Sequence, residues 1–208
     1  RSTAGSRCTT GFSPTSGHSP TTTKNSSGWS VKETSWRGGR AAAARAIAKW
    51  PFVDPARIGI WGWRGGGAST LDAMFRYPDT YATGLSVAPV ADLHYYDTIY
   101  QERYGGLPKD HPVEWKQSSP ITFAAQLKGN LLLVHGTGDD NVHYQGSEAL
   151  IDALIAANKP FSVFPYPNRS HSISEGSGTQ RHLFSLLTRY LHEKLPPGPI
   201  ATATSSAR

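Results

Sequence analysis

The sequence has little of what would define a disulfide-bonded or membrane-spanning protein. It holds one cysteine, Cys8, and no run of about 18 apolar residues in its 208 positions. A single cysteine excludes a framework of disulfides within the chain. Because no such apolar run is present, we expect no membrane span. The N-terminus also has no short apolar core, so no signal peptide is visible and the compartment stays open.

Apolar residues are scarcest at the start of the chain. Ser, Thr and Gly fill 23 of the first 40 positions, and Val31 is the only Val, Ile, Leu or Met among them. Such a segment cannot bury a core, so we predict a low-complexity tail over residues 1–40. We expect a second, disordered tail over residues 198–208. The folded domain is predicted to occupy residues 41–197 between them.

The net charge of +6 belongs to the first part of the chain. Residues 1–50 hold eight Lys or Arg against one acid, whereas residues 51–208 hold 13 against 14. Eight charges spread over fifty positions form no compact basic patch, which is the usual footprint of nucleic-acid binding. We therefore expect no nucleic-acid partner.

A glycine-rich turn is the most informative feature of the predicted domain. The segment Trp61–Thr70 reads WGWRGGGAST, and it follows a predicted strand and precedes a predicted helix. In serine hydrolases of the GxSxG type, flanking glycines allow a sharp strand-to-helix turn that exposes the central serine. Gly62 and Gly66 hold the flanking positions here. Arg64 stands where the motif has its nucleophilic serine.

Later segments place an acid and a histidine in the order of the same fold class. The step from residue 64 to Asp139 is 75 residues, and the step from Asp139 to His171 is 32 residues. Nucleophile, acid and histidine follow one another in this order in α/β-hydrolases, whose strands and helices alternate around a parallel sheet. We therefore predict a partial α/β-hydrolase fold. Its strands are expected over residues 57–61, 83–88, 130–135 and 161–166, and helices over residues 40–50, 68–77 and 179–195.

Four longer segments make a family resemblance specific. They contain the glycine-rich turn, which in hydrolases is called the nucleophile elbow, the acid Asp139, and a tyrosine-rich stretch between the two. They occupy residues 58–67, 88–90, 95–108 and 135–144. Together they resemble the catalytic domain of dipeptidyl peptidase IV-like enzymes, bacterial ones above all, in the prolyl oligopeptidase family of serine peptidases. The resemblance implies release of N-terminal dipeptides from peptides with Pro or Ala in the second position, through an acyl-enzyme. It implies no cofactor, and it is compatible with a homodimer.

The resemblance also implies a role for each site residue. Asp139 would orient His171, which would act as general base and then as acid, and the N–H of Gly65 would bind the oxyanion. A small apolar pocket would take the proline ring, with Trp63 beside it and Asn141 as a polar contact. The expected walls of this pocket are Val90, Tyr96, Tyr100 and Val142.

Arg64 is the departure from the family pattern that bears most on activity. A guanidinium is not a nucleophile and cannot lose a proton at working pH, so an acyl-enzyme has no atom on which to form. We therefore expect this copy to be inactive. There are two smaller departures. Position 172 is Ser, where relatives have Gly. The first half of the family's sheet, the second oxyanion donor and the β-propeller that precedes the domain in relatives are not visible in this sequence.

Two local patterns have competing interpretations. His135, Asp139, Asp140 and His143 are residue types that bind zinc, but they match the acid loop of the hydrolase. We therefore expect no metal, and structural roles for the two histidines. The tyrosines between residues 95 and 104 fit either ordinary helix packing or a substrate pocket.

Three functions stay open on the sequence alone. The chain is a member of the dipeptidyl peptidase lineage inactivated by Arg64, a pseudoenzyme that binds proline-containing peptides without cleaving them, or a gene fragment without a stable fold. A broader esterase or acylaminoacyl hydrolase is a fourth reading, which the tyrosine-rich segment fits less well. We favour the first.

Overall fold

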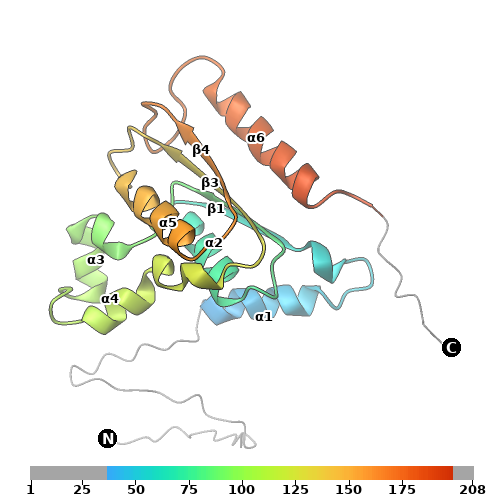
Figure 1. The fold of residues 1–208 in the computed structure, drawn as a ribbon, viewed down its shortest axis with the longest axis horizontal. Helices are drawn as coiled ribbons and strands as arrows, with labels where there is room; N and C mark the ends of the chain where they lie inside the picture. The colour runs from blue at the N-terminus through green and yellow to red at the C-terminus, as the bar shows by residue number, and fades with distance from the viewer. Residues whose placement is uncertain (1–36, 199–208) are drawn as a thin grey trace, which may run out of the picture. The chain divides into compact units, whose positions relative to one another are not determined.

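A four-stranded parallel sheet lies at the centre of the structure. The structure is a computed structural model, and it describes residues 37–198. The strands lie side by side in chain order (Figure 1). Most of the two predicted tails, up to residue 36 and from residue 199 on, lies outside the described residues. The strands are β1 Gly59–Trp63, β2 Thr83–Val87, β3 Asn130–Gly136 and β4 Ser162–Tyr166.

The register of the sheet brings the ends of its strands together. Trp63 of β1 pairs with Val87 of β2, and Val87 pairs with Val134 of β3. Gly136 at the end of β3 pairs with Tyr166 at the end of β4. Because parallel strands all end at the same edge, the loops that follow β1, β3 and β4 meet there.

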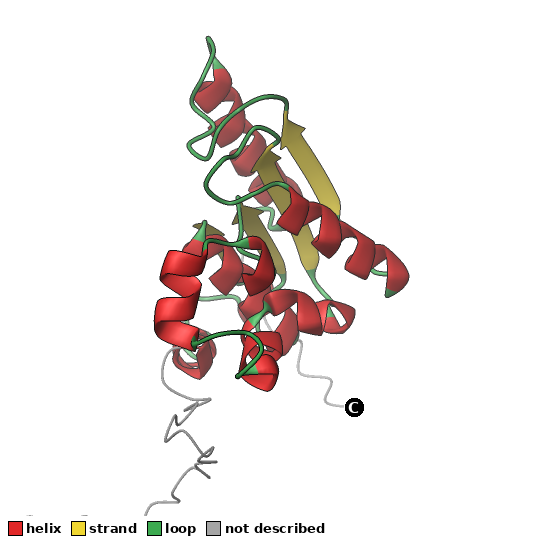
Figure 2. Ribbon diagram, turned by 90° about the vertical axis from the view of Figure 1, so that its left-hand side faces the viewer, coloured by secondary structure: helices red, strands yellow, loops and turns green. Residues whose placement is uncertain are grey.

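Helices cover both faces of the sheet. Figure 1 shows α6 on one side, and α2 and α5 on the other, and Figure 2 shows the strands between these two layers. Among the helices of the described residues, none has both the length and the apolar character that a membrane crossing needs. The helices are α1 Arg37–Ile47, α2 Gly65–Arg76, α3 Thr98–Gly105, α4 Pro112–Ser118, α5 Gln145–Ala156 and α6 Thr179–Lys194, with 3-10 turns at Pro55–Arg57, Leu93–Tyr95 and Pro120–Gln126.

The apolar run of β3 supplies the core on both faces. Leu131 and Leu133 pack in one cluster with residues of α2 and α5, whereas Leu132 and Val134 pack in a second cluster with residues of α6. All four side chains are buried, and burial of each contributes roughly 1.5–3 kcal/mol. A continuous apolar run is what a parallel strand covered on both faces requires, so the prediction for this strand is confirmed.

The first strand is shifted from its prediction at both ends, since it ends at Trp63 instead of residue 61, and it is less buried than a parallel strand usually is. It begins at Gly59 instead of residue 57, because Pro55–Arg57 form a 3-10 turn that the Asp54 side chain caps. Strands of a parallel sheet are normally buried on both faces, but Ile60 is only half-buried and Trp61 is 57% exposed. In the described residues β1 lies at an edge of the sheet, and no strand covers its outer side.

The helices predicted from the sequence are present with shifted ends. α1 covers 37–47 where 40–50 was expected, and residues 48–50 form a turn instead. α2 begins at Gly65, three residues earlier than predicted, because the glycine run forms its first turn. α6 covers 179–194, one residue shorter than predicted.

The turn between β1 and α2 depends on close backbone approach. A Cβ on Gly62 would overlap with the backbone carbonyl of Gly66, and a Cβ on Gly67 would lie 2.7 Å from the carbonyl oxygen of Val87. By contrast, a Cβ on Gly65 or Gly66 would meet nothing within 4 Å. The essential glycines are therefore Gly62 and Gly67, and the second of these was not singled out from the sequence.

This geometry predicts opposite effects of two alanine substitutions in the same turn. Gly62→Ala should lower the free energy of unfolding by about 1–3 kcal/mol, since backbone must move to admit the methyl group. Gly66→Ala should leave stability unchanged or raise it by up to about 1 kcal/mol, because alanine favours a helix. Urea unfolding followed by circular dichroism measures both, and equal midpoints for the two variants would contradict the packing described here.

Candidate active site

Arg64 occupies a constrained turn between β1 and α2. Its backbone has φ 52° and ψ −115°, a conformation that costs a residue with a side chain on the order of 1–3 kcal/mol. The Arg64 N–H donates to the carbonyl of Val87 at 2.9 Å, and the Arg64 carbonyl accepts from the N–H of Ala68 at 2.8 Å. These bonds hold the residue at the strand-to-helix junction. The turn therefore has the form predicted for a nucleophile elbow.

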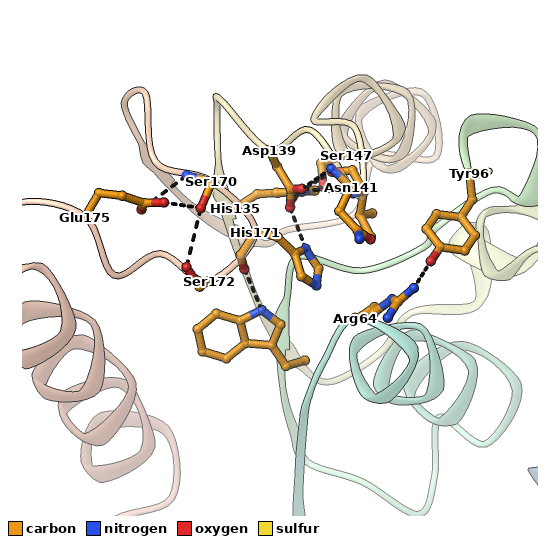
Figure 3. Close-up of polar contacts among 12 residues, drawn as sticks. Arg64, Tyr96, His135, Asp139, Asn141, Ser147, Ser170, His171, Ser172 and Glu175 are labelled. Atoms are coloured by element: carbon orange, nitrogen blue, oxygen red, sulfur yellow. Dashed lines mark hydrogen bonds and ion pairs between the residues drawn. The ribbon is translucent and has the colours of Figure 1, made fainter.

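The side chain of Arg64 leaves the turn toward α3 and the loop before it. Its guanidinium donates a hydrogen bond to the hydroxyl of Tyr96, and its central carbon lies 5.3 Å from the centre of the Tyr96 ring (Figure 3). Within residues 37–198, no carboxylate forms an ion pair with this guanidinium. The positive charge therefore rests against an aromatic residue that the sequence assigned to the substrate pocket.

Asp139 and His171 meet beside this turn, as their order predicted. Asp139 Oδ2 is 2.8 Å from His171 Nδ1, and Asp139 Oδ1 accepts the backbone N–H groups of Asn141 and Val142, both at 2.9 Å. The Asp139 side chain is fully buried, whereas that of His171 is 23% exposed. Because an ionised carboxylate only accepts, Nδ1 of His171 carries a hydrogen. Figure 3 shows the His171 ring directed toward Arg64.

The loop that carries Asp139 and the loop that carries His171 are tied together by backbone contacts. Gly136 has no room for a Cβ, because the carbonyl of Arg169 lies against it. The N–H of Gly138 donates to the same carbonyl at 3.1 Å. On the other side, the indole N–H of Trp63 donates to the carbonyl of His171 at 3.0 Å. Trp63 therefore supports the backbone of the histidine loop.

His135 is the site neighbour that the sequence did not identify as a partner of the acid. Its Nε2 lies 3.1 Å from Asp139 Oδ2 and 2.9 Å from the carbonyl oxygen of Val142, and its Nδ1 lies 2.7 Å from Ser147 Oγ. A structural role was expected for it, and its burial fits that role. The available signal was its position at the end of an apolar strand, four residues before the acid.

Burial and hydrogen bonding act on these two groups in different proportions. Burial alone would raise the pKa of Asp139, but the hydrogen bond from His171 and the backbone N–H groups of Val142 and Asn141 outweigh it, and the pKa lies below its usual value of 3.8. Burial lowers the pKa of His135 below its ordinary 6.5, and the nearby Asp139 carboxylate only partly opposes this. An ionised acid therefore lies beside a neutral, buried imidazole.

The residues predicted to form a proline pocket are only partly brought together. Val90, Tyr96 and Val142 are buried in one apolar cluster, against which Ala68 and Leu93 pack. The ring of Tyr100 is edge-on to Tyr96 with centres 6.2 Å apart, but Tyr100 itself is exposed. Trp63 packs with the α6 cluster instead, and Asn141 is exposed.

Three further residues of these two loops that the sequence singled out, Asp140, His143 and Ser172, are exposed. Asp140 and His143 face solvent, so the structural role expected of His143 finds no support in burial. Across the described part of the chain, no three His, Cys, Asp or Glu side chains gather so that they could hold a metal ion. Ser172 is exposed, and its Oγ lies 2.8 Å from Ser174 Oγ and 3.4 Å from Ser170 Oγ. Ser170 in turn donates to Glu175 (Figure 3).

A parallel sheet with an elbow after one strand, an acid after another and a histidine after the next defines a partial α/β-hydrolase fold. The sequence profile of the prolyl oligopeptidase family matches residues 39–197. This chain therefore belongs to the prolyl oligopeptidase family, whose members are serine peptidases.

Similarities to individual proteins support the same family membership. The prolyl endopeptidase FAP of Mus musculus is 38% identical over 154 residues, which cover 73% of this chain and 20% of that protein. Dipeptidyl peptidase 4 of Felis catus is likewise 38% identical, with the same coverage of 73% and 20%. The crystal structure of Porphyromonas gingivalis dipeptidyl peptidase 4 superposes with a TM-score of 0.75 at 44% identity, covering 76% of this chain and 22% of that one. The chain thus spans about a fifth of the length of these relatives.

The lowered pKa of His135 predicts a loss of stability in mild acid. The unfolded chain binds a proton at this histidine near pH 6.5, whereas the folded chain does so only at lower pH, so its contribution is complete above about 6.5 and is lost as pH falls. The contribution of Asp139 is lost only below its ordinary 3.8. Urea midpoints between about pH 7 and pH 5 should fall less steeply in His135→Gln than in the parent chain, and identical slopes would contradict this assignment.

Proposed function

We propose that this chain carries part of the catalytic domain of a serine dipeptidyl peptidase and that Arg64 leaves this copy unable to hydrolyse peptides. The observation that carries the first part is the 2.8 Å contact between Asp139 Oδ2 and His171 Nδ1, beside an elbow of the nucleophile type. The chemistry that the resemblance to dipeptidyl peptidases implies is attack on a peptide carbonyl, formation of an acyl-enzyme, and release of an N-terminal dipeptide that ends in Pro or Ala.

Each residue of the dyad has a role in that chemistry. The buried Asp139 carboxylate holds Nδ1–H of His171, so Nε2 is the nitrogen left to accept a proton from a nucleophile and return it to the leaving amine. Gly65 is the first residue of α2, and an N–H in the first turn of a helix has no acceptor within the helix. That N–H is our proposed oxyanion donor.

With Arg at position 64, the site lacks the nucleophilic serine oxygen that this arrangement needs. A guanidinium has no lone pair to attack a carbonyl and stays protonated at any working pH. Loss of the nucleophile in a serine protease lowers turnover by about a million-fold. The guanidinium also lies over Tyr96, which would form one wall of the proline pocket. It therefore blocks both the chemistry and the proposed binding surface.

Restoring the serine should restore turnover in the full chain. Arg64→Ser is expected to cleave a chromogenic Xaa-Pro substrate, while the parent chain and Arg64→Ala show no rate above buffer. Adding His171→Ala to Arg64→Ser should lower the rate by up to about a million-fold, because loss of the histidine of a serine-protease triad costs about as much as loss of the nucleophile. Release of the chromophore measures each rate.

Circular dichroism on each variant is the control for folding. A folded Arg64→Ser chain without turnover would sink the peptidase proposal for this chain.

A second candidate function is binding of proline-containing peptides without cleavage. The observation that favours it is the cluster of Val90, Tyr96 and Val142, which is assembled although the nucleophile is absent. In that function the chain keeps the apolar surface for a proline ring and uses Arg64 as its cover. The surface becomes accessible when the guanidinium moves away from Tyr96.

Peptide binding should respond to the loss of that cover. Arg64→Ala should bind a fluorescent peptide with Pro in the second position roughly three- to tenfold more tightly than the parent chain, because one hydrogen bond and one cation–π contact no longer compete. The matched control is the same peptide with Gly in that position. Fluorescence anisotropy measures both, and a flat titration with folded protein rules out this second function.

A further inference from the structure

His135 contacts three parts of the site through its two ring nitrogens. We define the acid loop as residues 137–144. The Nε2 atom reaches both Asp139 Oδ2, at 3.1 Å, and the carbonyl of Val142, at 2.9 Å, within this loop. The Nδ1 atom reaches Ser147 Oγ in α5 at 2.7 Å. With both nitrogens occupied and 1% of its side chain exposed, the ring has one defined orientation.

The partners of His135 fix where its proton lies. A backbone carbonyl can only accept a hydrogen bond, so Nε2 must carry the hydrogen that Val142 receives. In a neutral ring Nδ1 then accepts, and the hydroxyl of Ser147 is the donor. The Nε2–H is thus shared between the Val142 carbonyl and Asp139 Oδ2.

Two imidazoles therefore donate to the same carboxylate oxygen, and their environments differ. His171 is 23% exposed, whereas His135 is enclosed between the acid loop and α5, with the Tyr144 ring edge-on at 5.5 Å. A buried imidazole resists charging. His135 consequently donates to Oδ2 without neutralising the carboxylate, and the negative charge is left to act on His171.

We infer that His135 is a positioning residue, which directs Oδ2 of Asp139 toward His171 and ties the acid loop to the apolar cluster through Val142. The role in catalysis rests on the proposed peptidase function. The positioning itself requires neither a serine nor a peptide. It can therefore be measured in the chain that carries Arg64.

Proton NMR of the full chain can detect the positioning directly. The Nδ1–H of His171 donates to a carboxylate, and such a proton is strongly deshielded and exchanges slowly with water. His135→Gln keeps an N–H at the place of Nε2, whereas His135→Asn carries its amide near the place of Nδ1 and loses that donor. We expect the His171 resonance to persist with Gln and to exchange at least about tenfold faster with Asn, the factor for losing one hydrogen bond to a charged group.

His171→Gln assigns the resonance, because that variant must lack it, and circular dichroism verifies the fold of each chain. Equal persistence of the signal in folded Gln and Asn variants overturns the inference. Equal loss in both also overturns it, since the intact ring and not its donor would then be what matters.

The unmodified chain supplies a test that does not depend on how the variants fold. Nitrogen-15 spectra distinguish a protonated ring nitrogen from a bare one, and we expect His135 to carry its hydrogen on Nε2 with Nδ1 bare. A hydrogen on Nδ1 instead overturns the inference, because Oδ2 then has no donor in His135. Absence of turnover in Arg64→Ser would affect the proposed peptidase function and leave each of these results unchanged.

Discussion

The site depends on one buried carboxylate. Asp139 accepts two backbone N–H groups of its own loop on Oδ1 and two imidazole groups on Oδ2, so it joins β3, the acid loop and the histidine loop at a single point. A buried charge without such partners would cost several kcal/mol. Burial and hydrogen bonding are therefore both required: burial concentrates the charge of Asp139 on His171, and the four donors make that burial tolerable.

The backbone frame of the site is equally constrained and does not depend on which side chain stands at position 64. Gly62 and Gly67 allow the turn between β1 and α2, and Gly136 allows the histidine loop to approach the end of β3. None of these contacts involves the side chain of Arg64. The backbone frame of a hydrolase can therefore occur in a chain that lacks the nucleophile.

Apolar runs and motif order along the sequence predicted the strands and the pairing of the acid with the histidine. Apolar runs gave β2, β3 and β4 to within one residue at either end, and motif order placed Asp139 and His171 together. The early start assigned to β1 failed because Asp54 caps a turn there. Contacts that depend on how the loops fold back could not be predicted. Arg64 reaches a tyrosine 32 residues away, and His135 reaches an acid only four residues on because the acid loop returns onto the end of β3. The domain edges stay predictions.

The exposure of the side chain at position 64 allows selection on folding and selection on catalysis to act separately at this site. Because this side chain is exposed, packing of the core requires no particular side chain at position 64, and only selection on chemistry can maintain a serine in so strained a turn. A lineage that stops needing hydrolysis can therefore exchange the nucleophile in one mutational step and keep the rest of the site in working order. The same step taken in reverse would find the acid, the histidine and the turn already in place.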